Sequence, residues 1–324
     1  MKPKTAIEQA LAAVRELDSD TLPPEAVKTL RQALGASRNR IVAQAAKLVA
    51  RRRVSECTED LIAAFDRLMQ QPETTDKGCL GKLAIVEALG EVEHGDPEVY
   101  LRGIRHVQME PVFGPPEDTA ANLRGNCALA LAAMGYPETV FELVALAMDR
   151  EVQARRAAIK ALAYLGTREC ELLLRMKALA GDAEPDVTGE CLAGVIHVAP
   201  DRSLDFVEAF LGHADPLVAE GAALAIGESH LPEAFGVLHG HWQREVDPDF
   251  RQMLLLPMAL TRCDAAFDLL IEQVEEGSRA LAEYALTALR VFGVQAERAR
   301  RIDDAVRQRG DPGLTNRYQK EFGE

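Results

Sequence analysis

VQARRAAIKALAYLG, residues 152–166, places apolar residues three and four positions apart, sets three cations among them and ends on a glycine. This spacing predicts an amphipathic helix that stops at Gly166. Aromatic residues make up only 5% of the chain, and Ala, Leu and Val supply most of its 48% hydrophobic content. That mixture suits thin, closely packed helices and is poor for strands. We therefore expect an all-α protein.

The same pattern returns seven more times, near residues 40, 80, 122, 186, 216, 249 and 280. A usually small residue follows nine positions after each opening residue: Ala50, Gly90, Ala132, Ala163, Ile196, Gly227, Ala259 and Arg290. From Ala132 onward these positions are 31 to 33 residues apart. A period held over so many intervals predicts a repeat architecture.

A second apolar-periodic segment lies between these helices, for example ETVFELVALAM and ECELLLRMKAL. Each period is therefore expected to be a helical hairpin. Several hairpins turn through an aspartate that can cap the incoming helix, at Asp149, Asp182, Asp215 and Asp247. A hairpin this small cannot cover its own apolar face, so neighbours must stack. The predicted fold is an α-solenoid of about eight hairpins.

This frame resembles the HEAT-repeat family, and most closely its short bacterial form, the phycobilisome-lyase (PBS-lyase) HEAT-like repeats. The family pattern D-P-x-V-R-x-x-A-A-x-A-L-G is visible as DPLVAEGAALAIG (215–227), DPDFRQMLLLPMAL (247–260) and ARRAAIKALAYLG (154–166). The resemblance covers roughly residues 24–308 and implies an armadillo-like helical scaffold, which by itself assigns no function.

The family's arginine follows the opening residue in only three of the eight repeats, at Arg124, Arg155 and Arg251. The Asp-to-Arg ladder that the family implies is therefore expected to be incomplete. Arg155 is expected to pair with an aspartate of a neighbouring turn.

The repeats are expected to occupy residues 24–295. Residues 1–23 are expected to form an N-terminal capping helix and linker, and residues 296–324 a C-terminal capping helix and tail. Two turns between helices are expanded, at 70–78 and 110–119. Both fall on the same kind of turn in adjacent repeats, so we expect them side by side on one edge of the solenoid.

Such insertions are either neutral drift in surface loops or a binding edge. Phe113, which lies between Pro111 and Pro115, favours the second interpretation. An aromatic side chain in a stiff, exposed loop is a plausible anchor for a partner protein.

The second helix of each hairpin lines the concave side in HEAT-like solenoids. At 100° per residue, positions two, six and nine after the opening residue point away from the buried arc. In the repeats from 186 to 260 these positions form a small, apolar floor, which is either a shielded surface or a trough for an amphipathic helix or extended peptide. The candidate partner-binding residues on this side are Leu129, Arg156, Lys160, Ala193, Glu220, Leu224, Gln252 and Leu256.

The charge of the chain is −14, which argues against a protein that mainly holds nucleic acid. Residues 1–53 nevertheless carry a net charge of +6, so the remainder is strongly acidic. The basic residues that end this region either complement the end of a helix or face an acidic partner. They are Arg38, Arg40, Lys47, Arg51, Arg52 and Arg53.

No phosphate-binding glycine loop, GxSxG or HExxH pattern occurs. His239 and His241 are separated by one residue, so they point about 200° apart on a helix, which is poor geometry for one metal ion. HEAT-like deoxyhypusine hydroxylases hold two irons with His-Glu dipeptides, and this sequence contains none. We therefore assign no catalytic, cofactor or metal residue.

The six cysteines form no CxxC pair and are expected to be reduced core residues of a cytoplasmic protein without a membrane segment. The sequence favours a non-enzymatic scaffold that binds a protein or a peptide, for instance a basic amphipathic segment. Nucleic acid and membrane partners are not expected, and the oligomeric state stays open. The alternative is a HEAT-like enzyme, either a DNA glycosylase or a bilin lyase.

Overall fold

The computed structural model describes residues 25–293 and 296–323, and these residues divide into two compact units at Leu165 and Gly166. The expected capping helix of residues 1–23 lies outside the described residues. The fold is all-α, as predicted. None of the helices described here is both long and apolar enough to cross a bilayer.

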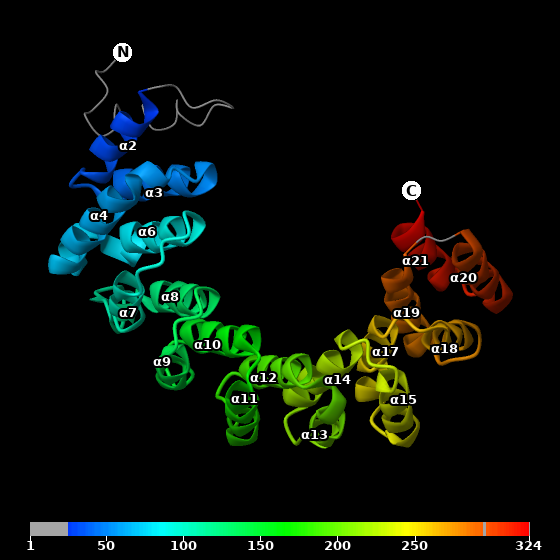
Figure 1. Ribbon diagram of the computed structural model, residues 1–324. Helices are drawn as coiled ribbons and strands as arrows, with labels where there is room; N and C mark the ends of the chain where they lie inside the picture. The colour runs from blue at the N-terminus through cyan, green and yellow to red at the C-terminus, as the bar shows by residue number, and fades with distance from the viewer. Residues whose placement is uncertain (1–24, 294–295, 324) are drawn as a thin grey trace, which may run out of the picture. The chain divides into compact units, whose positions relative to one another are not determined.

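Unit 1 is a stack of helical hairpins (Figure 1). Its second helices α3, α6, α8 and α10 pack side by side in chain order, and the first helices α4, α7 and α9 form a layer beside them. The longer helices are α2 (Ala26–Leu34), α3 (Asn39–Arg52), α4 (Thr58–Gln70), α6 (Leu80–Glu91), α7 (Glu98–Ile104), α8 (Ala121–Ala133), α9 (Thr139–Leu146) and α10 (Val152–Leu165). The short elements are η1 (Ser55–Cys57), α5 (Pro72–Thr75), η2 (Lys77–Cys79), β1 (Met109–Glu110) and β2 (Glu117–Asp118).

Unit 2 continues the same plan, with α12 packed on α14, α14 on α17 and α17 on α19. Its α-helices are α11 (Arg168–Ala180), α12 (Pro185–Val198), α13 (Leu204–Glu208), α14 (Pro216–Glu228), α15 (Ala234–Arg244), α16 (Pro248–Met253), α17 (Leu255–Leu260), α18 (Asp264–Glu275), α19 (Arg279–Ala288), α20 (Ala296–Arg309) and α21 (Pro312–Phe322). Its 3-10 helices are η3 (Pro200–Arg202), η4 (Ala209–Gly212) and η5 (Leu289–Phe292).

The eight predicted second helices are all present, as α3, α6, α8, α10, α12, α14, the α16–α17 pair and α19. The seventh differs from expectation because it is broken at Leu254. Pro257 lies in its second half and has no backbone N–H to bond to the preceding turn, so the helix divides there. Asp215 and Asp247 cap their helices through side-chain oxygens, as predicted.

The C-terminal segment differs from the sequence-based description. The C-terminal segment, expected to be one helix and a tail, forms two helices, α20 and α21. Asp311 accepts hydrogen bonds from the backbone N–H groups of Gly313 and Leu314, and Pro312 begins α21, so this turn repeats the signal of the earlier hairpins. The two expanded turns are also ordered, because they contain α5, η2 and the β1–β2 hairpin.

Candidate functional site: second-helix surfaces and the loop edge

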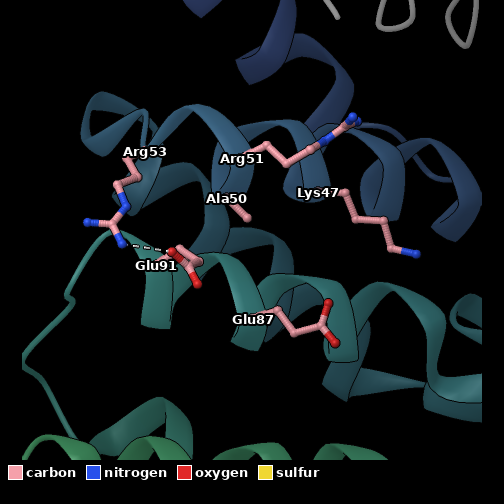
Figure 2. Close-up of a pocket in the computed structure, with 6 residues that line it drawn as sticks. All are labelled: Lys47, Ala50, Arg51, Arg53, Glu87 and Glu91. Atoms are coloured by element: carbon pink, nitrogen blue, oxygen red, sulfur yellow. Dashed lines mark hydrogen bonds and ion pairs between the residues drawn. The ribbon is translucent and has the colours of Figure 1, made fainter. Parts of the chain in front are cut away.

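In unit 1 the α3 and α6 second helices form an open groove. The α3 side presents Arg40, Gln44, Lys47 and Arg51, which recur every three or four residues on one helix face. A cavity of about 660 Å³ lies between the C-terminal halves of the two helices, where Lys47 and Arg51 project from α3 and Glu87 projects from α6 (Figure 2). A second cavity of about 580 Å³ continues along their N-terminal halves, where Leu80 and Leu83 add apolar surface.

The predicted basic cluster is divided between two roles. Arg53 follows α3 in the left-handed conformation, and its guanidinium lies 3.1 Å from Glu91 (Figure 2). It also lies 3.7 Å from Glu93. It therefore holds the following hairpin against α3. Arg40 and Lys47 instead line the groove and are exposed, so both can meet an anionic group.

The two expanded turns of unit 1 contact each other, as predicted. Gln108 donates from its amide nitrogen to the carbonyl oxygen of Asp76 at 2.8 Å, and Glu110 accepts from the backbone N–H of Gly78 at 2.7 Å. Lys82 lies between the turns and donates to Asp76 at 3.0 Å and to Gln108 at 2.8 Å. Lys82 and Asp76 have no exposed side-chain surface. The loop edge therefore has a buried, ion-paired base.

A second buried cation joins this edge to the next hairpin. Arg124 donates to Asp118 at 2.7 Å and to both carboxylate oxygens of Asp149 at 2.8 Å, and only 3% of its side chain is exposed. Arg124 thus forms the Asp-to-Arg contact that the HEAT resemblance implies. Arg155 is also buried and donates to the backbone carbonyl groups of Asp149 and Arg150.

Phe113 lies at the tip of the β1–β2 hairpin that this buried base supports. Its side chain is fully exposed, and Val107, Met109 and Val112 are exposed near it in sequence. Asp118 at the end of β2 accepts the backbone N–H of Gln108, and the hydroxyl of Thr119 donates to Glu110. The structure therefore presents an apolar tip on an ordered hairpin.

Acidification should destabilise unit 1 through Asp118. Burial acts to raise the pKa of this carboxyl, but hydrogen bonds from the backbone N–H groups of Gln108 and Ala120, together with Arg124, lower it overall. A carboxyl whose pKa is lower in the folded state stabilises the fold above its unfolded pKa of about 3.9, and this contribution is lost as the pH falls through the folded value. We expect a lower urea midpoint at about pH 3 than at about pH 6, and a smaller difference for Arg124→Met.

Circular dichroism across a urea series at both pH values measures these midpoints. Other carboxyls also contribute to acid sensitivity, so the comparison between variant and wild type isolates the part that depends on Arg124, which contacts Asp118 and Asp149. An identical acid shift in the two proteins would show that the Arg124 contact does not lower the pKa of Asp118.

In unit 2 the predicted trough residues lie on second helices that pack together. Ala193 is on α12, Glu220 and Leu224 are on α14, Gln252 is on α16 and Leu256 is on α17. All five are at least partly exposed, and Leu256 is 45% exposed. The remaining predicted residues, Leu129, Arg156 and Lys160, belong to α8 and α10 of unit 1 and are likewise at least partly exposed.

The side chain nine positions after the opening residue of each second helix was predicted to point outward, and in this region that prediction is wrong. Ile196, Gly227 and Ala259 are buried because the neighbouring second helices approach closely at this point. A Cβ added at Gly227 would lie 2.3 Å from the carbonyl oxygen of Pro257. The trough floor therefore consists of the second and sixth positions alone.

The histidine-rich hairpin around Trp242 is an aromatic cluster. His239 stacks between Phe235 and Trp242, with ring centroids 5.3 and 6.0 Å apart, and the guanidinium of Arg251 lies 4.3 Å from the centre of the Trp242 ring. Among the described residues no group of three or more His, Cys, Asp or Glu side chains is arranged to hold a metal ion.

The cysteines are free thiols, and five of the six are buried, as expected of core residues. Burial raises the pKa of the Cys57 thiol to about 11 and those of Cys79 and Cys191 to about 12. Cys263 is partly exposed, and its sulfur accepts from the backbone N–H of Ala266 at the start of α18. The thiols of Cys57, Cys79 and Cys191 stay protonated at neutral pH because their pKa values are raised, so none of the three is a nucleophile there.

Two first helices, α9 in unit 1 and α11 in unit 2, each carry exposed apolar side chains that were not predicted. On α9, Phe141 and Val144 are exposed, as is Met148, two residues after the helix ends. On α11, Leu172, Met176 and Leu179 are exposed. The signal was present in ETVFELVALAM and ECELLLRMKAL, because both segments carry more apolar residues than one buried face can use.

No family model and no curated protein matches this sequence. Among solved structures, the chain is similar to an engineered protein, with a TM-score of 0.38, 16% identity, and coverage of 98% of this chain and 92% of that chain. It is also similar to the CpcE–CpcF complex of phycocyanin lyase from Nostoc, with a TM-score of 0.36 and 16% identity. That match covers 90% of this chain and 96% of the other. The match to human deoxyhypusine hydroxylase in complex with glycerol has a TM-score of 0.31 and 19% identity. It covers 81% of this chain and 92% of the hydroxylase chain. None of these similarities assigns the chain to a family.

Proposed function

We propose that this chain is a non-enzymatic scaffold that binds a protein or a peptide through the loop edge of unit 1 and the second-helix surfaces. The observation that carries the proposal is the full exposure of Phe113 on a hairpin with a buried, ion-paired base. Because the Phe113 side chain is fully exposed, its burial against a partner would remove its whole apolar surface from water and so favour binding. Because its backbone is already ordered, little conformational entropy is lost on binding.

The trough of unit 2 supports the same function with a different ligand preference. Leu224 and Leu256 supply apolar surface on α14 and α17, and Glu220 lies one helical turn before Leu224. An apolar strip beside a carboxylate fits a basic amphipathic segment. Binding there should weaken as salt is added, because salt screens exposed charges.

Affinity capture from the native lysate, followed by titration of the captured partner, tests this proposal. We expect Phe113→Ser to weaken binding roughly 30-fold, which corresponds to about 2 kcal/mol for an aromatic hot spot. Phe141→Ser is the matched control, because it removes another exposed phenylalanine of unit 1 outside the loop edge. The double variant Leu224→Glu plus Leu256→Glu tests the trough.

A partner that binds equally well to wild type, Phe113→Ser and the double trough variant would contradict the assignment of these surfaces. Visible absorbance after expression with a bilin, or excision of a damaged base from DNA, would contradict the non-enzymatic assignment itself.

A further inference from the structure

The outer face of α11 in unit 2 is an apolar stripe. Leu172, Met176 and Leu179 are 60%, 59% and 70% exposed, and their spacing of four and three residues places them on one side of the helix. Single exposed apolar residues are ordinary on protein surfaces, but three large ones on consecutive turns are typical of a contact surface.

The opposite side of α11 fixes this orientation. Leu174 and Ala178 are buried, and Lys177 pairs with Asp182 at 2.8 Å just beyond the end of the helix. Glu171 accepts from Arg175 and from Arg202 on η3. Because α11 is held by apolar packing and buried charge pairs, the stripe cannot rotate inward.

Exposed charged residues flank both ends of the stripe. Arg168 is exposed at the first residue of α11, whereas Glu184 and Asp186 are exposed just after its C-terminal end. Glu169, also at the first turn, instead turns back to its own backbone N–H and to the hydroxyl of Thr167. Arg168 therefore supplies a cation at one end of the apolar stripe, beside Glu169, and Glu184 and Asp186 supply anions at the other end.

We propose that α11 pairs in antiparallel fashion with α11 of a second copy of this chain. This inference concerns a surface other than those of the proposed function. An antiparallel pair places Leu172 of one copy against Leu179 of the other and Met176 near the two-fold axis. It also brings Arg168 of each copy to the acidic end of its partner, around Glu184. A surface that complements itself under a two-fold rotation is what a symmetric dimer requires.

The dimer should be weak and reversible. Stable interfaces bury at least about 1,200 Å² in total, and one helix from each copy supplies less than that. We therefore expect a dissociation constant in the micromolar range, on the order of 10 µM or weaker.

Sedimentation velocity of the full chain between about 5 and about 500 µM tests the proposal. The wild-type mass should rise from the 35.4 kDa of one chain toward twice that value. Leu172→Glu plus Met176→Glu should remain monomeric at every concentration. The control Val246→Glu, which alters an exposed apolar residue of unit 2 outside the stripe, should dimerise like wild type.

Charge reversal tests the antiparallel geometry. Arg168→Glu should weaken dimerisation about tenfold, and Arg168→Glu plus Glu184→Arg should restore it, because each reversed charge then meets its complement in the other copy. Circular dichroism confirms that each variant remains folded. The proposal is overturned if wild type stays monomeric, if the stripe variant still dimerises, or if the double reversal does not recover what the single reversal loses.

Discussion

Replacement of Lys82 by methionine should lower the free energy of unfolding of unit 1 by about 3–5 kcal/mol. Lys82 and Asp76 are completely buried, and the ammonium group donates to Asp76 and Gln108. Methionine fills a similar volume but leaves the carboxylate of Asp76 without its counter-charge in a site without water access. Urea unfolding followed by circular dichroism, with hydrogen exchange of the α6 amides as a local readout, measures the loss.

Two further variants make this prediction specific. Lys47→Met removes an exposed lysine from α3 of the same unit and should change stability by less than about 0.5 kcal/mol. Lys82→Met plus Asp76→Asn should be more stable than Lys82→Met alone, because no unpaired charge remains in the core. Equal stability of Lys82→Met and wild type would show that the buried pair is not needed to hold the loop edge.

The repeat frame could be predicted from sequence because it depends on short-range periodicity. Each hairpin repeats the apolar spacing of its neighbours and several repeat the Asp turn, so one well-marked helix such as 152–165 predicts the others. The Asp311–Pro312 turn carries the same signal, and its helix α21 was overlooked because the segment around it is rich in charge.

The base of the loop edge could be predicted only in part. Lys82 follows the opening residue Gly81 just as Arg124 follows Leu123, so both occupy the position of the family's arginine. Lys82 thus takes the place of the family's arginine with a different cation, which the arginine pattern does not predict. The partner Asp76 lies within an expanded turn whose path depends on contacts with Gln108, and periodicity does not describe such contacts.

The directions in which side chains point were predicted less well than the positions of the helices. A rotation of 100° per residue places a side chain on its own helix but does not say how close the next helix lies. Gly227 and Ala259 permit close approach, and so positions that point away from the hairpin core are covered by the neighbouring repeat. The apolar stripe on α11 was missed for a related reason, since apolar residues on a first helix were all assigned to the core.

Gly227→Ala should lower the stability of unit 2 by about 3 kcal/mol, although alanine favours helices more than glycine does. Gly227 lies inside α14, and an added Cβ would be 2.3 Å from the oxygen and 2.9 Å from the carbon of the Pro257 carbonyl group. These are backbone atoms of α17, so relief requires that the two packed helices separate. Trp242, the single tryptophan of the chain, lies on α15 of this unit, and its fluorescence during urea unfolding reports the change.

Gly240→Ala is the matched control for this effect. Gly240 lies inside α15, and an added Cβ there has no heavy atom of another residue within 4 Å apart from chain neighbours and its own helix backbone. The gain in helix propensity is then unopposed, and Gly240→Ala should raise stability by about 0.5–1 kcal/mol. Opposite signs for the two substitutions would establish that close contact between α14 and α17 requires glycine at position 227. Stabilisation by both substitutions would mean that α14 and α17 can separate at little energetic cost. Close packing at the ninth position of the repeat would then not require glycine.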